Sequence, residues 1–178
     1  MTEFENKVSN YNFEDYSKWK GRWDLINGIP YAKVPMPSPK HQHLAGELHI
    51  SLSNAIKEAQ CKKCKVYQPI DLKINENTIL NPDLLIDCKE IKKHFLDFPP
   101  NLVVEILSKS TETKDRNSKF QIYQSFGIKY YIIVDPKTEK MEIYQLQPDG
   151  KYKLQDKNTE LVLMENCIIN PDFKSIWD

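Results

Sequence analysis

A stripe of apolar residues in the first third of the chain predicts an amphipathic helix. The stripe recurs at every fourth position, at Leu44, Leu48, Leu52 and Ile56. This spacing places the four side chains on one face of a helix, which we expect to begin at Ser38 or Lys40 and to end near Lys57. The prolines at positions 35, 37 and 39 precede it and interrupt regular structure, because each lacks a backbone N–H.

Short apolar runs predict strands, and they surround a second helix. Strand candidates lie at residues 65–74, 82–87, 101–107 and 130–134. Between the last two runs, aromatic residues spaced three apart predict a helix over 115–126, with Gly127 well placed to end it. Near the N-terminus, Asn27-Gly28 between two apolar stretches predicts a β-hairpin, preceded by a short helix over 11–20. We expect antiparallel edge strands at 141–146, 152–155 and 161–163.

The order of these elements predicts an α/β (α+β) fold. The core reads helix, strand, strand, strand, helix, strand, which indicates a mixed central sheet flanked by helices. A hairpin is added before this core and antiparallel strands after it. No repeat or linker interrupts the 178 residues, so we expect a single domain, 1–178, with residues 1–12 as a flexible tail.

Charge and hydropathy narrow the class of protein. The 25 basic residues balance the 25 acidic ones, which is evidence against a protein that coats nucleic acid but compatible with an enzyme that meets DNA transiently. No apolar run reaches the roughly 20 residues of a membrane-spanning helix, and the polar N-terminus does not resemble a signal peptide. We therefore expect a cytoplasmic protein with no membrane partner.

The four cysteines give a weak signal. Cys61 and Cys64 form a C-x-x-C, but Cys88 and Cys167 do not form a second one, and no H-x-x-x-H lies nearby. Half of a zinc motif is weak evidence for a metal site. We predict free thiols and keep a zinc site as the less favoured alternative.

A carboxylate in the apolar run 101–107 is the first candidate for chemistry. A strand that is apolar on both faces is normally buried, and an unpaired carboxylate there costs several kcal/mol. Glu105 therefore needs a metal ion or a cationic partner, unless it lies at the strand end and reaches water. Asp83 begins the preceding strand, so in an antiparallel pair it converges with Glu105. A divalent cation such as Mg²⁺ relieves the repulsion between two carboxylates, although Asp83 is also a candidate turn residue.

Phosphodiester hydrolysis also needs a cationic group near the developing charge. Position 107 is Leu, so the strand does not supply one. On the next helix, Asp115 and Lys119 are four residues apart and share a face, and Lys119 reaches the same cleft if that helix packs over it. The alternative is an exposed ion pair between these two residues, which helix spacing alone favours.

Several segments together resemble the Uma-type restriction endonucleases, a branch of the PD-(D/E)XK nuclease superfamily. The matching stretches are 23–28, 37–42, 82–83, 99–111, 115–119 with Tyr123, and 127–136. The resemblance covers about residues 16–146, and the stretch 99–111 followed by the spaced Asp, Lys and Tyr is its most specific part.

The resemblance implies an αβββαβ restriction-endonuclease-like core, a Mg²⁺ site in which Mn²⁺ substitutes, and DNA as substrate. It aligns Asp83 with the family's PD aspartate and Glu105 with its acidic (D/E)XK residue. The family's lysine falls at Leu107, so the role passes to Lys119. Asp24 stands where the family often carries Glu.

Two more positions near these motifs are candidates for supporting roles. His41 is a candidate to orient a carboxylate or contact a phosphate, although a solvated histidine is the commoner case. Ser108 follows Glu105 and is expected to cap the turn there. The cluster Lys62, Lys63 and Lys65 is a candidate phosphate contact, with a solvated strand entry as the favoured alternative.

The residues and the resemblance together predict metal-dependent cleavage of DNA, with Asp83 and Glu105 as metal ligands and Lys119 as the third catalytic residue. Two alternatives remain. One is a nuclease-fold module that binds nucleic acid or a protein without turnover. The other is a buried polar network that only specifies the fold. A homodimer is expected by analogy with enzymes that cut both strands.

Overall fold

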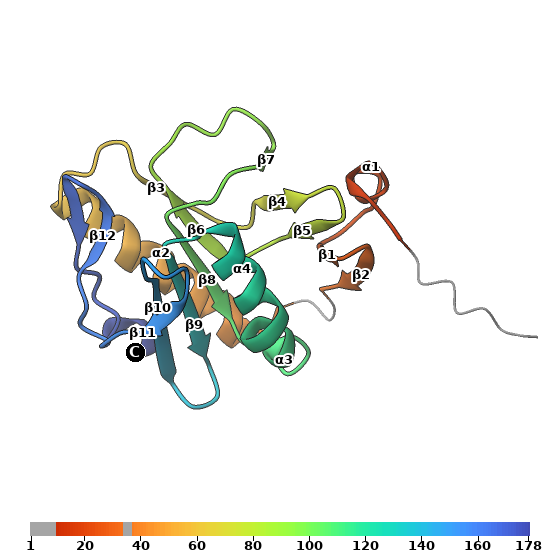
Figure 1. Ribbon diagram of the computed structural model, residues 1–178. Coiled ribbons are helices and arrows are strands. Elements are labelled where there is room, and N and C mark those ends of the chain that lie inside the picture. The colour runs from red at the N-terminus through yellow and green to blue at the C-terminus, as the bar shows by residue number, and fades with distance from the viewer. Residues whose placement is uncertain (1–9, 34–36) are drawn as a thin grey trace, which may run out of the picture.

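The computed structural model describes residues 10–33 and 37–178, so most of the predicted N-terminal tail lies outside the described residues. The protein has a mixed α+β fold with helices on both faces of a central sheet (Figure 1). That sheet has six strands in the order β11-β10-β9-β8-β6-β3, in which only β8 and β9 run parallel. The predicted order of the core is confirmed by α2 (Pro39–Glu58), β3 (Lys65–Tyr67), β6 (Leu84–Asp87), β8 (Leu102–Ile106), a helix, and β9 (Tyr130–Asp135).

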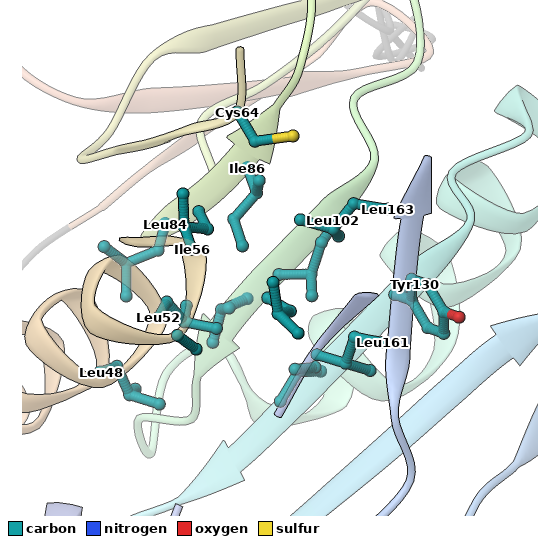
Figure 2. Close-up of a cluster of buried hydrophobic side chains, with 14 of the residues drawn as sticks. Leu48, Leu52, Ile56, Cys64, Leu84, Ile86, Leu102, Tyr130, Leu161 and Leu163 are labelled. Atoms are coloured by element: carbon teal, nitrogen blue, oxygen red, sulfur yellow. The ribbon is translucent and has the colours of Figure 1, made fainter. Parts of the chain in front are cut away.

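Helix α2 forms where the apolar stripe predicted it. The Ser38 side chain caps its N-terminus by accepting a hydrogen bond from the His41 N–H at 3.2 Å, and Pro39 occupies the first turn. The stripe is fully buried against alternate residues of β6, β8 and β9. Figure 2 shows this core, in which Leu52 and Ile56 lie against the sheet beside Leu84.

The second helix covers the opposite face of the sheet. It begins as α3 (Glu112–Lys114), widens into a π-helical turn, η1 (Asp115–Lys119), and ends as α4 (Phe120–Phe126). Gly127 terminates it with φ +89°, as predicted. Tyr123 packs with Val103, Leu85 and Tyr131, the strand residues that alternate with those facing α2.

A second, five-stranded sheet packs over the same face as α4. Its order is β2 (Ile29–Ala32), β1 (Trp23–Ile26), β5 (Thr78–Leu80), β4 (Asp71–Asn75), β7 (Phe95–Leu96). The predicted hairpin is β1–β2, and both turn residues, Asn27 at φ +51° and Gly28 at φ +78°, have the positive angles of a type I′ turn. The helix α1 (Phe13–Tyr16) is shorter than the predicted 11–20. A capping box at Asn12 stabilises its N-terminus.

The single strand predicted over residues 65–74 is wrong. The chain leaves the central sheet after β3, turns at Gln68 to Ile70 around Pro69, and enters the second sheet as β4. Both halves are rich in β-forming residues, so composition does not reveal the change of sheet. The strands β5 and β7 were not predicted.

The strands of the C-terminal region also belong to two different sheets. Strands β10 (Lys140–Leu146) and β11 (Tyr152–Leu154) extend the central sheet at its edge, as predicted. Strand β12 (Leu161–Met164) instead pairs with β13 (Cys167–Ile169) in a separate hairpin, and a short 3₁₀ turn, η2 (Ser175–Trp177), follows. Leu161 and Leu163 enter the core beneath α2 (Figure 2), so this hairpin closes that core.

The prediction of free thiols is wrong, because all four cysteines form disulfides. Cys61 pairs with Cys167, and Cys64 pairs with Cys88. The partners are 106 and 24 residues apart, and tertiary packing alone brings them together. Within residues 10–33 and 37–178, none of the helices has the length and apolar character to span a membrane.

The hairpin turn provides a stability test. A Cβ on Gly28 would lie 2.5 Å from Asn10 Oδ1 and 3.1 Å from Asn10 Cα, at a φ of +78°. We therefore expect Gly28→Ala to lower the free energy of unfolding by about 1–3 kcal/mol. Gly46→Ala, in the middle of α2 with open space at its Cβ, should instead raise it by about 0.5–1 kcal/mol. Urea unfolding followed by circular dichroism measures both, and equal effects would contradict the strained turn.

Candidate active site

Asp83 and Glu105 lie side by side at the junction of β6 and β8. The two strands are antiparallel, with Leu84 opposite Val104, and the same register carried one step further places Asp83 opposite Glu105. The N–H of Ile106 donates to Asp83 Oδ2 at 3.0 Å, which ties the aspartate to the end of β8. Both carboxylates are buried. The predicted convergence of these two residues is therefore present in the structure.

Two cationic or basic side chains surround Asp83. Arg22 Nη2 is 3.3 Å from its Oδ1, and His41 Nε2 is 3.2 Å from its Oδ2. Burial by itself would raise the pKa of Asp83, but the hydrogen bond with His41, the charge of Lys33 and the Ile106 N–H more than offset it, so the pKa lies well below its ordinary value. His41 thus contacts a carboxylate, one of the two roles expected for it.

Glu105 contacts the helix that contains η1 and α4. Its Oε1 accepts hydrogen bonds from Lys119 Nζ at 2.8 Å and from the Tyr123 hydroxyl at 2.7 Å. Burial raises the pKa of Glu105 to about 7, against the opposing charge of Lys119. Burial and the nearby glutamate also raise the pKa of Tyr123, so its hydroxyl stays protonated and acts as a donor.

Lys119 is fully buried and joins three carboxylates. Besides Glu105, its Nζ lies 3.3 Å from Asp24 Oδ2 and 3.1 Å from Asp115 Oδ1. Burial works to lower the pKa of Lys119, but the charges of Asp24, Glu105 and Asp115 raise it well above its ordinary value. The ion pair with Asp115 exists, yet the alternative that placed it on the surface is wrong.

The π-helical turn explains how one helix directs Asp115, Lys119 and Tyr123 into the same site. On a regular α-helix each four-residue step drifts by about 40° around the axis, and the wider π turn offsets part of that drift. The carbonyl of Asp115, inside this turn, accepts a hydrogen bond from the buried Tyr131 hydroxyl at 3.0 Å. Such turns are frequent at functional sites.

A cavity of about 730 Å³ opens beside the two carboxylates. Asp83 and Glu105 form part of its wall, with His41 and five cationic side chains around them, Arg22, Lys33, Lys40, Lys109 and Lys137. Ser108 also lines it, and its hydroxyl lies 3.1 Å from Ser110 Oγ and 3.0 Å from Thr111 Oγ1. The turn is closed by the Ser108 backbone carbonyl, which accepts from the N–H groups of Thr111 and Glu112, and not by the Ser108 hydroxyl. Lys119 lies behind Glu105, away from this wall.

Some residues of the site were not singled out from the sequence. Arg22 and Lys33 flank the hairpin β1–β2, and Lys33 Nζ donates to the Asn81 carbonyl and lies 3.9 Å from Asp24 Oδ1. The only feature of the sequence that could have indicated them is their position on either side of a hairpin that also carries Asp24. The cluster Lys62, Lys63 and Lys65 lies outside the site. In the pairing of β3 with β6, Lys65 stands opposite Asp87, at the other end of β6 from Asp83.

The oxygen donors at the cavity suit a hard divalent cation. Magnesium typically takes one or two protein carboxylates and completes its shell with water and phosphate oxygens, and Asp83 and Glu105 provide such a pair. With all four cysteines in disulfides, the described part of the chain holds no group of three His, Cys, Asp or Glu side chains placed to bind a metal ion by themselves. A cation held here therefore depends on water or a substrate for its remaining ligands.

Comparisons with known proteins agree with this architecture. The chain is 28% identical over 146 residues to the uncharacterized protein slr1290 of Synechocystis sp. (strain ATCC 27184 / PCC 6803 / Kazusa), with 78% of this chain and 76% of the relative covered. It also matches the crystal structure of a "putative nuclease belonging to DUF820" from Anabaena variabilis ATCC 29413 with a TM-score of 0.71 and 14% identity, over 93% of this chain and 97% of that one. At this identity the likeness shows a shared fold.

A family model extends the similarity to nearly the whole chain. The model of Uma2, described as "Putative restriction endonuclease", matches residues 13–172. This range includes both carboxylates at the cavity, the buried lysine and the histidine that contacts Asp83. The chain therefore belongs to the Uma2 family.

Proposed function

We propose that this protein is a metal-dependent endonuclease that hydrolyses phosphodiester bonds in DNA. The observation that carries the proposal is the pairing of Asp83 with Glu105 at the wall of a cavity whose other charged side chains are cationic. Carboxylates suit a divalent cation, and the surrounding cations suit a polyanion. The family and the nuclease fold support the same function.

In this proposal Asp83 and Glu105 hold Mg²⁺, and Mn²⁺ substitutes for it. The bound ion would supply Lewis-acid polarisation of the phosphate and a water of lowered pKa. Asp83 is already ionised, because His41, Lys33 and the Ile106 N–H favour its charged form. Glu105 must lose its proton near neutral pH before it serves as a ligand, because burial raises its pKa to about 7.

Lys119 acts through Glu105 in this proposal, as a positioning residue. Its ammonium and the Tyr123 hydroxyl hold the same carboxylate oxygen, Oε1, which fixes the direction of the glutamate. Asp24 and Asp115 in turn fix the ammonium. The predicted catalytic role of Lys119 thus becomes one of orienting and ionising the metal ligand.

Arg22 and Lys33 are the cations best placed to meet the scissile phosphate. Both line the cavity, and Arg22 contacts Asp83 directly. Lys40, Lys109 and Lys137 would meet flanking phosphates, since a nucleic acid carries one charge per nucleotide. The zero net charge of the chain is compatible with this arrangement because the cations are concentrated at one place.

The competing function is a nuclease-fold module that binds nucleic acid or a protein without turnover. The absence of a cavity-facing lysine two residues after Glu105 is the observation that favours it. It differs from the enzyme in metal dependence, so one experiment separates the two.

We expect Asp83→Asn and Glu105→Gln each to lower Mg²⁺-dependent nicking of supercoiled plasmid by at least about 10³-fold, because each removes a charged ligand. Calorimetric titration with Mn²⁺ should show weaker binding to both variants than to the wild type. The control is Glu165→Gln, an exposed carboxyl in the C-terminal hairpin, which should match the wild type in both assays. Metal-dependent nicking that survives in both site variants would contradict the mechanism, and DNA binding without nicking by the wild type would favour the module.

The raised pKa of Glu105 predicts a pH dependence of stability. Between its ordinary value of 4.5 and about 7 the folded protein holds a proton on Glu105 that the unfolded chain releases, so this group's contribution to stability falls as pH rises through that window. Glu105→Gln lacks this titration. Urea midpoints measured in a chelator should therefore show the wild type losing stability relative to Glu105→Gln as pH rises toward 7, with a constant difference above it. A difference that grows in favour of the wild type would refute the assignment.

Replacing the central cation tests the buried network. Lys119→Met leaves the carboxylates of Asp24, Glu105 and Asp115 buried without their shared ammonium, so we expect the free energy of unfolding to fall by about 3–5 kcal/mol. Lys18→Met removes a lysine from an exposed ion pair with Glu14 and should leave the urea midpoint unchanged. A similar small effect of both substitutions would show that Lys119 does not hold the site together.

A further inference from the structure

The four cysteines of the chain meet at one end of the core beneath α2, at the end of β6 opposite to Asp83. Cys61 and Cys64 lie in the turn after α2, Cys88 follows β6, and Cys167 begins β13. All four are buried, with exposed fractions between 3% and 9%. The two disulfides also touch, since Cys64 Sγ lies 3.5 Å from Cys167 Sγ. Figure 2 shows Cys64 beside Ile86, at the end of the strand that begins next to Asp83.

This gathering is closer than two separate crosslinks require. In a tetrahedral zinc centre with Zn–S bonds of about 2.3 Å, neighbouring sulfurs are about 3.8 Å apart. The 3.5 Å contact between Cys64 and Cys167 is near that spacing. The sulfurs of each bonded pair would have to separate to about that spacing once the two S–S bonds are broken.

The spacing of Cys61 and Cys64 and the tight turn between them also suit a pair of metal ligands. The C-x-x-C spacing is common among zinc ligands. Here the Cys64 N–H donates to the Cys61 carbonyl at 3.0 Å, in a tight turn that follows the left-handed residue Gln60. The turn directs both side chains into the core, while Lys62 and Lys63 between them are exposed.

The charge around the cluster favours thiolates. Zn²⁺ with four thiolates carries a net charge of −2, whereas two disulfides carry none. Lysines flank the cysteines in sequence, with Lys62, Lys63 and Lys65 around the C-x-x-C and Lys89 after Cys88, and all four are exposed. Cations near a buried anionic centre stabilise it, which gives a role to the basic cluster that does not reach the candidate active site.

We propose that Cys61, Cys64, Cys88 and Cys167 form a structural Zn²⁺ site when the two disulfides are reduced. Two equivalents of a dithiol reductant transfer four electrons and four protons to the two S–S bonds, which yields four thiols and two oxidised reductants. Binding of Zn²⁺ to the four thiols then releases four protons. No position is left for water, so the site is structural and takes no part in hydrolysis.

The zinc site would crosslink the same segments by coordination that the disulfides crosslink covalently. Cys61–Cys167 ties the β12–β13 hairpin to the end of α2, and Cys64–Cys88 ties the start of β3 to the end of β6. One Zn²⁺ would hold the same segments together in a reducing compartment. The fold would then be crosslinked under either redox condition.

Cobalt substitution of the full-length protein tests the proposal. The protein is reduced with a dithiol in the presence of a chelator, desalted without oxygen, and titrated with Co²⁺, whose visible spectrum distinguishes tetrahedral thiolate coordination from octahedral oxygen coordination. We expect the thiolate spectrum to saturate at one Co²⁺ per chain and to be displaced by one Zn²⁺. Protein kept oxidised, or reduced and alkylated, should show none of it.

The controls separate this site from the proposed nuclease centre. Asp83→Asn should retain the full thiolate spectrum, and Cys88→Ser and Cys167→Ser should lose or alter it while folding is followed by circular dichroism. The reduced wild type should also melt at a higher temperature with Zn²⁺ than with chelator. A reduced wild-type protein that binds no Co²⁺, or binds it only with an octahedral spectrum, overturns the proposal without reference to any variant.

Discussion

The buried ammonium of Lys119 is the interaction on which the arrangement of this site depends. It is shared by carboxylates from three separate segments, Asp24 on β1, Glu105 on β8 and Asp115 on η1. A buried carboxylate without a partner is strongly destabilising, so each of these segments is held in a position that lets its acid reach the same lysine. The hairpin, the central sheet and the helix are thereby fixed relative to one another, and the cavity beside Glu105 takes its shape from them.

The two carboxylates at the cavity have different surroundings and therefore different protonation behaviour. Asp83 is surrounded by Arg22, His41 and a backbone N–H, and its pKa is lowered. Glu105 lies deeper, and burial raises its pKa to about 7 even though Lys119 donates to it. Neighbouring titratable groups whose pKa values are pushed apart by their surroundings are a common feature of catalytic sites. The candidate site therefore couples a fixed charge to one that changes near neutral pH.

Part of this site followed from the sequence, and part did not. The convergence of Asp83 and Glu105 followed from two adjacent apolar runs and the geometry of an antiparallel pair. Lys119 was reached through its four-residue spacing from Asp115 and through the family resemblance. Its complete burial was not foreseen, because helix spacing tells which residues share a face but not what covers that face. Arg22 and Lys33 flank the predicted hairpin, but the sequence did not single them out, because their contacts with Asn81 and Asp83 join positions 48 to 61 residues apart.

The sequence by itself determined the elements whose cause is local. The turn at Asn27 and Gly28 and the capped, striped helix α2 formed as predicted, because their conformations depend on nearby residues. Only the tertiary structure decided that residues 65–74 divide between two sheets, that the four cysteines meet, and that Lys119 is enclosed by three acids. Each of these depends on which distant surface packs against a segment, and hydrophobic packing and charge compensation act between residues that are close in space rather than in sequence.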